Sequence, residues 1–113
     1  KIVISTGVVT TLAGSTSNYS GSTDATGTSA SFNYPSGITT DGTNLYVGDK
    51  RNNRIRKIVI DNGTVTTLAG SSSGFADNAT GTSAKFNRPA GITTDGTNLY
   101  VPDYSNNRIR KIE

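Results

Sequence analysis

Residues 35–58 read PSGITTDGTNLYVGDKRNNRIRKI, and the same motifs return at residues 89–112 as PAGITTDGTNLYVPDYSNNRIRKI, 54 positions later. A second shared motif, VTTLAG, occupies residues 9–14 and 65–70, which lie 56 positions apart. The first copy therefore carries two additional residues, and we place them in the loop Asn18–Asp24. Self-similarity at a fixed period of this length is typical of repeat architectures. The chain is built from repeated copies of one structural unit.

Each unit contains short β-prone runs separated by turn residues. In the first complete unit the predicted strands are Gly37–Thr40, Leu45–Val47, Arg54–Ile60 and Thr64–Leu68. Asp-Gly and Asn-Gly steps between such runs indicate hairpins. No window shows a helical period. The unit is therefore predicted to be a four-stranded antiparallel meander.

The strands carry apolar side chains on both faces. Ile55 and Ile58 are three positions apart in one strand, so they point to opposite faces. The run Leu45–Val47 is apolar throughout. A sheet of this kind needs a packing partner on each side, which the blades of a β-propeller provide. A sandwich of two sheets would instead show a polar outer face.

These motifs resemble the NHL-repeat β-propellers. The resemblance is carried by the runs Pro35–Asp41, Leu45–Asp49 and Asn52–Ile58, each of which occurs twice and together with the others. It implies an all-β fold whose blades close a ring, with roughly six blades in the family's usual form. The long loop between the fourth strand and the next first strand departs from that form, as does the presence of only two blades.

Alignment of the units divides the chain into three parts. Residues 1–14 match the end of a third strand plus a fourth strand, residues 15–70 a full blade, and residues 71–113 a blade without its fourth strand. Two wedge-shaped blades leave apolar faces and a strand edge uncovered. We therefore expect identical chains to join head to tail, the spare strand of one completing the last blade of the next. The resemblance favours a homotrimer with six blades over a homotetramer with eight.

Composition excludes several classes of function. The 113 residues include no Cys and no His, so neither a disulfide framework nor a Ser-His or Cys-His nucleophile can form. The usual zinc and iron ligand sets are also missing. No segment is long and apolar enough to span a membrane. We expect no catalytic residue, metal or cofactor, and instead a self-assembling scaffold. The near-identical repeats and the ends inside a blade favour an engineered or excised fragment.

One rim of the propeller is the candidate binding surface. Differences between the copies concentrate in the loops of one rim, and loops on a rigid scaffold commonly carry binding. The candidate residues are Tyr19, Tyr34, Lys50, Arg51, Phe75, Lys85, Arg88 and Tyr104. A protein or glycan is the alternative function, with RNA a less favoured ligand of the basic and aromatic side chains. Ordinary drift in unconstrained loops would produce the same differences.

Other charged residues receive structural roles. We expect Asp49 and Asp103 to cap loop N–H groups or to pair with Arg54 and Arg108, the alternative being a cation site near the central channel. Asp41 and Asp95 are predicted turn formers. The stems of Arg56, Lys57, Arg110 and Lys111 are expected to cover apolar surface on the third strands.

Overall fold

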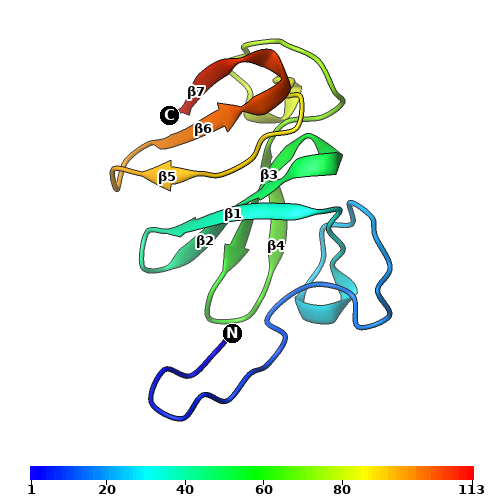
Figure 1. The fold of residues 1–113 in the computed structure, drawn as a ribbon, viewed down its shortest axis with the longest axis vertical. Helices are drawn as coiled ribbons and strands as arrows, with labels where there is room; N and C mark the ends of the chain where they lie inside the picture. Colours follow the sequence, from blue (N-terminus) through cyan, green and yellow to red (C-terminus); the bar gives the residue numbers. More distant parts are fainter.

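Two antiparallel sheets make up the computed structural model, which describes residues 1–113. The first sheet has the order β1-β2-β3-β4 and the second the order β5-β6-β7. The strands are β1 (Pro35–Thr40), β2 (Asn44–Asp49), β3 (Arg54–Val59), β4 (Val65–Ala69), β5 (Thr93–Thr94), β6 (Leu99–Asp103) and β7 (Arg108–Ile112). Single turns of 3-10 helix occur in the loops as η1 (Gly27–Ser29), η2 (Lys50–Asn52), η3 (Gly81–Ser83) and η4 (Tyr104–Asn106). Figure 1 shows the larger sheet between the smaller one and the N-terminal segment.

The predicted meander is confirmed in the first sheet, where each strand pairs antiparallel with the next along the chain. β1 and β2 are longer than expected, because their pairing continues to Pro35 opposite Asp49. The four predicted runs all fall on strands. No helix in the structure is long and apolar enough to cross a membrane.

The length difference between the copies lies closer to the fourth strand than predicted. Gly21 and Gly74 are equivalent, since each donates its N–H to the backbone of the phenylalanine at the same place in its unit. Gly14 precedes Gly21 by seven positions, whereas Gly70 precedes Gly74 by four. Between this glycine and the next 3-10 turn the second copy is longer by one residue, since Gly27 follows Gly21 by six positions and Gly81 follows Gly74 by seven. The extra residues of the first copy therefore precede Gly21, only partly inside Asn18–Asp24.

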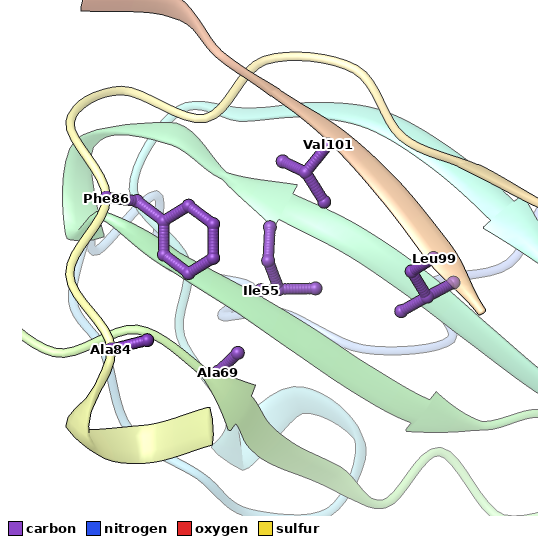
Figure 2. Close-up of a cluster of buried hydrophobic side chains, with 6 residues drawn as sticks. All are labelled: Ile55, Ala69, Ala84, Phe86, Leu99 and Val101. Carbon is purple, nitrogen blue, oxygen red and sulfur yellow. The ribbon is translucent and has the colours of Figure 1, made fainter. Parts of the chain in front are cut away.

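The two sheets pack face to face through a buried apolar layer. Ile55 of β3 lies at its centre in Figure 2, with Leu99 and Val101 of β6 on one side and Phe86 from the preceding loop on another. Ala69 and Ala84 complete the buried cluster. One face of the first sheet is thus covered by the second sheet.

The opposite face of the first sheet has its own apolar cluster. Val47, Ile58 and Val65 are buried there together with Ala30. Leu12 and Ala13, from the N-terminal segment, and Phe32 pack against them and remain partly exposed. Ile55 and Ile58 therefore do point to opposite faces, as the three-residue spacing predicted.

Glycines let the innermost strands of the two sheets meet backbone to backbone. Gly37 has a φ of +74°, and a Cβ placed there would lie 2.3 Å from the Cα of Gly91. The N–H of Gly91 donates to the carbonyl of Ser36 over 3.3 Å. A side chain at position 37 would force these strands apart, because the atoms in the way belong to the backbone.

The N-terminal residues form a hairpin outside the sheets. Val3 N–H donates to Val8 O over 2.9 Å, and Thr10 N–H to Lys1 O over 2.8 Å. The first bond matches the one from Val59 to Thr64 in the link between β3 and β4. Residues 1–10 thus repeat the geometry of a third-to-fourth strand connection. The division of the chain into residues 1–14, 15–70 and 71–113 stays a prediction.

Candidate functional site

One rim of the molecule gathers the variable loops. Arg51 in the link between β2 and β3 donates its N–H to Asn33 O, in the loop before β1, over 3.0 Å. Ser105 makes the same bond to Asn87 O over 3.0 Å in the second copy. We call the surface formed by these loops the variable rim. Two of its loops from each blade are hydrogen-bonded to each other.

A buried carboxylate holds the variable rim together. Asp49, at the end of β2, accepts the N–H of Asn33 over 2.8 Å on Oδ1. Its Oδ2 accepts Asn52 Nδ2 and Arg56 Nη1, both over 2.7 Å. The side chains of Asp49 and Arg56 are both 0% exposed. We call this set of contacts the rim brace, and its protein donors occupy both carboxylate oxygens.

The second copy repeats the rim brace. Asp103 accepts the N–H of Asn87 over 2.7 Å, and Asn106 Nδ2 and Arg110 Nη1 over 2.8 Å each. Capping of loop N–H groups by Asp49 and Asp103 is therefore correct. Because all of these donors come from the protein, the geometry favours the structural role over the cation site.

The expected pairing with Arg54 and Arg108 is wrong. Arg54 donates Nη1 to Ser22 O over 3.3 Å, and its buried Nε has no partner. Arg108 lies over the Phe75 ring, 3.9 Å from its centroid. The brace uses the arginine two positions further along the strand, Arg56 or Arg110, because that position is shielded from water inside the blade.

Arg56 and Arg110 bind loop groups far from them in sequence. Arg56 donates to Ser31 O, Thr23 O and Asp24, with a 2.6 Å contact from Nη2 to Asp24 Oδ1. The prediction that these two arginines cover apolar surface with their stems did not foresee that their guanidinium groups are buried and paired. Five donated hydrogen bonds of this kind use the whole fork of the side chain.

Exposed aromatic rings on the variable rim stack on basic side chains. The Arg51 guanidinium lies 3.7 Å from the centroid of Tyr34, and Lys50 Nζ lies 5.6 Å from that of Tyr104. Both tyrosine side chains are largely exposed. The structure therefore brings together four of the candidate residues in two stacked pairs, and a cation over an aromatic face adds roughly 0.5–1 kcal/mol at exposed sites.

The other candidate residues are more scattered. Phe75 stacks on Arg108, and Tyr19 is exposed without a stacking partner. Lys85 pairs through its backbone with Ala76. These residues do not join the Tyr34 and Tyr104 pairs in one pocket.

Tyr34 and Arg88 share a backbone conformation that the sequence did not reveal. Their φ angles are +54° and +57°, in the left-handed region. A side chain other than Gly or Asn costs roughly 1 kcal/mol there. The N–H of Arg88 is held by Asn53 Oδ1 over 2.9 Å. In the sequence, the only feature that the two residues share is that each directly precedes the proline at the start of the repeated motif, Pro35 or Pro89.

The opposite rim is formed by identical turns. Asp41 accepts the N–H groups of Asn44 and Thr43 over 2.7 and 2.9 Å, and the Tyr46 hydroxyl over 2.8 Å. These bonds, led by the one from Asn44, hold the pKa of Asp41 well below its usual range, and equivalent bonds do the same to the pKa of Asp95. Burial, followed by the bond to Asp41, raises the pKa of Tyr46. Asp41 and Asp95 are turn formers, as predicted.

Solved structures with this arrangement identify the class of fold. A nutrient-binding protein from Bacteroides thetaiotaomicron matches 99% of this chain with a TM-score of 0.80 and 27% identity, over 31% of its own length. One from Bacteroides ovatus matches 84% of this chain with a TM-score of 0.76 and 27% identity, over 26% of its own length. A four-stranded meander packed face to face against a three-stranded one, with their innermost strands in contact, makes this chain a segment of a β-propeller.

Sequence comparison identifies the repeat. The sequence model of the NHL repeat matches residues 32–58. NHL repeat-containing protein 2 of Bos taurus is 36% identical over 100 residues, and that of Homo sapiens is 35% identical. The match covers 82% of this chain and 14% of either relative. This chain belongs to the NHL-repeat family, and it spans about a seventh of the length of these relatives.

Proposed function

We propose that this chain is a non-catalytic propeller scaffold whose open flanks are covered by further copies of the same chain. The observation that carries the proposal is a contrast between equivalent residues. Ile55 of β3 is 0% exposed, because the second sheet covers it, whereas Ile109 of β7 is 71% exposed. An isoleucine that is exposed here but buried at the equivalent position of the other blade indicates that a further blade packs against β7.

A groove on the other flank matches this missing contact. It has a volume of about 300 Å³ and is lined by Ala13, Phe32, Ile38, Val47 and Ile58, among others. The groove lies on the face of the first sheet that the second sheet does not cover. The equivalent face of the second sheet, with Phe86 and Val101, receives Ile55 of β3, so we expect the groove to receive Ile109 of β7 from another copy.

Burial of apolar side chains would contribute to association. Burying an aliphatic side chain contributes roughly 1.5–3 kcal/mol. Ile38 and Ile109 would thus contribute roughly 3–6 kcal/mol at each contact between copies. Repeated head-to-tail contacts close a ring when the rotation between copies permits it. Three copies give the six blades usual in the family, and four copies give eight.

The residue types of the chain and the contacts of its buried carboxylates support a scaffold in place of an enzyme. The chain has no His and no Cys. The buried carboxylates of Asp49 and Asp103 are occupied by protein donors. Both carboxylates are 0% exposed, so their oxygens face the protein's own donors and lie out of reach of a substrate.

The proposal is tested by the mass of the assembly in solution. Native mass spectrometry and sedimentation across a dilution series are expected to give three times the 11.8 kDa of one chain. A mass of four chains would support the scaffold proposal and give a ring of eight blades in place of six. A folded, monodisperse monomer throughout the series would overturn the proposal.

The exposed aromatic residues favour a second function, glycan binding at the variable rim. Sugar rings stack on exposed aromatic side chains, and Tyr34 and Tyr104 offer two such faces beside cations. Their left-handed or loop positions are fixed by the rim brace, which keeps the surface rigid. The solved relatives described as nutrient-binding proteins support this direction.

This second function is tested by titrating neutral and acidic oligosaccharides into the assembled protein. Tyr34→Ala and Tyr104→Ala are each expected to weaken binding by about 2- to 12-fold, since a lost aromatic contact is worth about 0.5–1.5 kcal/mol. Thr43→Ala, on the opposite rim, is the matched control. Binding of single-stranded RNA with a steep salt dependence would instead identify a nucleic-acid surface, and equal affinity of all variants would place the site elsewhere.

A further inference from the structure

Two equivalent aspartates differ in what they bind, and the difference points to the partner of this chain. Asp24 accepts Arg56 on Oδ1, and it also accepts the Thr67 hydroxyl over 3.1 Å and the Thr67 N–H over 3.0 Å. It thereby ties the loop before the blade to the blade's outermost strand, β4. Its side chain is 44% exposed.

Asp77 occupies the same place in the second blade but lacks half of these contacts. Its Oδ1 accepts Arg110 Nη2 over 2.6 Å and Nε over 2.9 Å, as Asp24 accepts Arg56. Its Oδ2 accepts no hydrogen bond, and the side chain is 78% exposed. The missing donor is the threonine of a fourth strand, because β7 has no strand on its outer edge.

The chain itself contains the residue that would supply this donor. Thr11 precedes Thr67 by 56 positions and holds the same place in the motif VTTLAG. Neither its N–H nor its hydroxyl donates a hydrogen bond within the chain. Thr11 lies on the flank opposite β7, since Leu12 and Ala13 pack against the uncovered face of the first sheet. Thr11 therefore cannot reach Asp77 of its own copy, whereas Thr11 of a second copy can.

We infer that Thr11–Ala13 of one copy adds to the outer edge of β7 of another, with Asp77 accepting the N–H and hydroxyl of Thr11. This inference rests on the scaffold proposed above and names its contacts. The register follows from β3 and β4, where Ile55 lies opposite Ala69 and Arg56 opposite Thr67. The equivalent pairs are Ile109 with Ala13 and Arg110 with Thr11. Addition of a strand to an exposed edge is a general mode of recognition.

The N-terminal hairpin limits this contact on one side. Lys1 and Ile2 pair with Thr10 and Val9, at the positions that the partner's strand would take beyond Arg110. Two strands cannot share one edge. The joint therefore consists of the Thr11–Ala13 segment, and it leaves the hairpin of Lys1–Thr10 intact.

The register is tested by disulfide formation, which the absence of native Cys makes unambiguous. Residues directly opposite in an antiparallel pair have Cβ atoms about 4.5–5.5 Å apart, close to the range that a disulfide accepts. The double variant Ile109→Cys and Ala13→Cys is expected to form covalent chains of copies under mild oxidation. Ile109→Cys with Thr11→Cys, shifted by two residues, is the matched control and should crosslink far less. Efficient crosslinking of the control alone would overturn the register.

The contact of Asp77 with Thr11 is tested by a double-mutant cycle on the dissociation constant of the assembly. Asp77→Ala and Thr11→Ala are each expected to weaken association roughly tenfold. The double variant should be no weaker than the stronger single variant, because the two changes remove one contact. Asn78→Ala, which neighbours Asp77, should act independently of Thr11→Ala.

The outcomes separate this inference from the scaffold itself. A monomeric wild-type protein would overturn both. Assembly with fully additive effects of Asp77→Ala and Thr11→Ala, or without the predicted crosslink, would leave the scaffold standing and overturn the named joint.

Discussion

Replacing Arg56 by methionine is expected to destabilise the protein by about 3–5 kcal/mol, as removal of one partner from a buried ion pair commonly does. Methionine keeps the apolar stem but removes every donor of the guanidinium. Asp49 is then left as a buried carboxylate with only Asn33 and Asn52 as donors. A small domain has about 5–15 kcal/mol of stability in total, so the loss is a large part of it.

The change is measured as the free energy of unfolding in urea at one fixed protein concentration, because association also contributes to stability. Arg54→Met is the matched control on the same strand. It removes a single hydrogen bond to Ser22 and should cost about 1 kcal/mol or less. A loss for Arg56→Met no larger than that of the control would show that the rim brace does not stabilise the blade.

Replacing Ile109 by aspartate is expected to abolish association while leaving the single chain folded. The residue is 71% exposed in one chain, so the change disturbs no packing there. In the assembly the carboxylate would enter an apolar groove without a partner, which costs several kcal/mol. Since 1.4 kcal/mol is a factor of ten, the dissociation constant should rise by at least about a hundredfold.

Sedimentation and circular dichroism on the same samples give the two required readouts, mass and folding. Ile60→Asp is the matched control, because Ile60 is an exposed isoleucine outside the proposed joint. It should retain the mass of the wild-type assembly. If Ile109→Asp also retained that mass, β7 would not take part in association.

Local signals explain why the blade could be predicted from the sequence. The Asp-Gly turns and the apolar residues on both faces of the strands each act over a few residues, and the repeat shows the same signals twice. Such signals determine strands, turns and faces without reference to the rest of the chain. The opposite orientation of Ile55 and Ile58 depends only on their spacing, and it was correct.

The partner of Asp49 could not be predicted in this way. Arg54 was expected as a partner because it follows Asp49 closely in the sequence, and the structure does place it opposite Asp49 in the register of β2 and β3. Arg56 is its partner because it also binds Asp24 and two carbonyl groups from a loop more than 20 residues away. Only the folded chain brings those acceptors to one place, so no local pattern could reveal them.

The left-handed backbone of Tyr34 was hidden for a related reason. Sequence patterns associate positive φ with Gly and Asn, not with Tyr or Arg. The loop before each first strand imposes this conformation through its hydrogen bonds to the neighbouring loops. The backbone angle therefore does not depend on the residue type at this position. Asn53 and Asn107, which have the residue type expected at such angles, adopt them too.

The rim brace has a consequence for how such molecules grow. All charged contacts of Arg56 lie within residues 21–56, and those of Arg110 lie within residues 74–110. The ion pairs are therefore confined to a single unit, and neighbouring units contact each other mainly through apolar side chains. Duplication or deletion of a whole unit therefore leaves no buried arginine or aspartate without its ion-pair partner. Tandem copying of the gene segment can change the number of units without first having to redesign any polar interior.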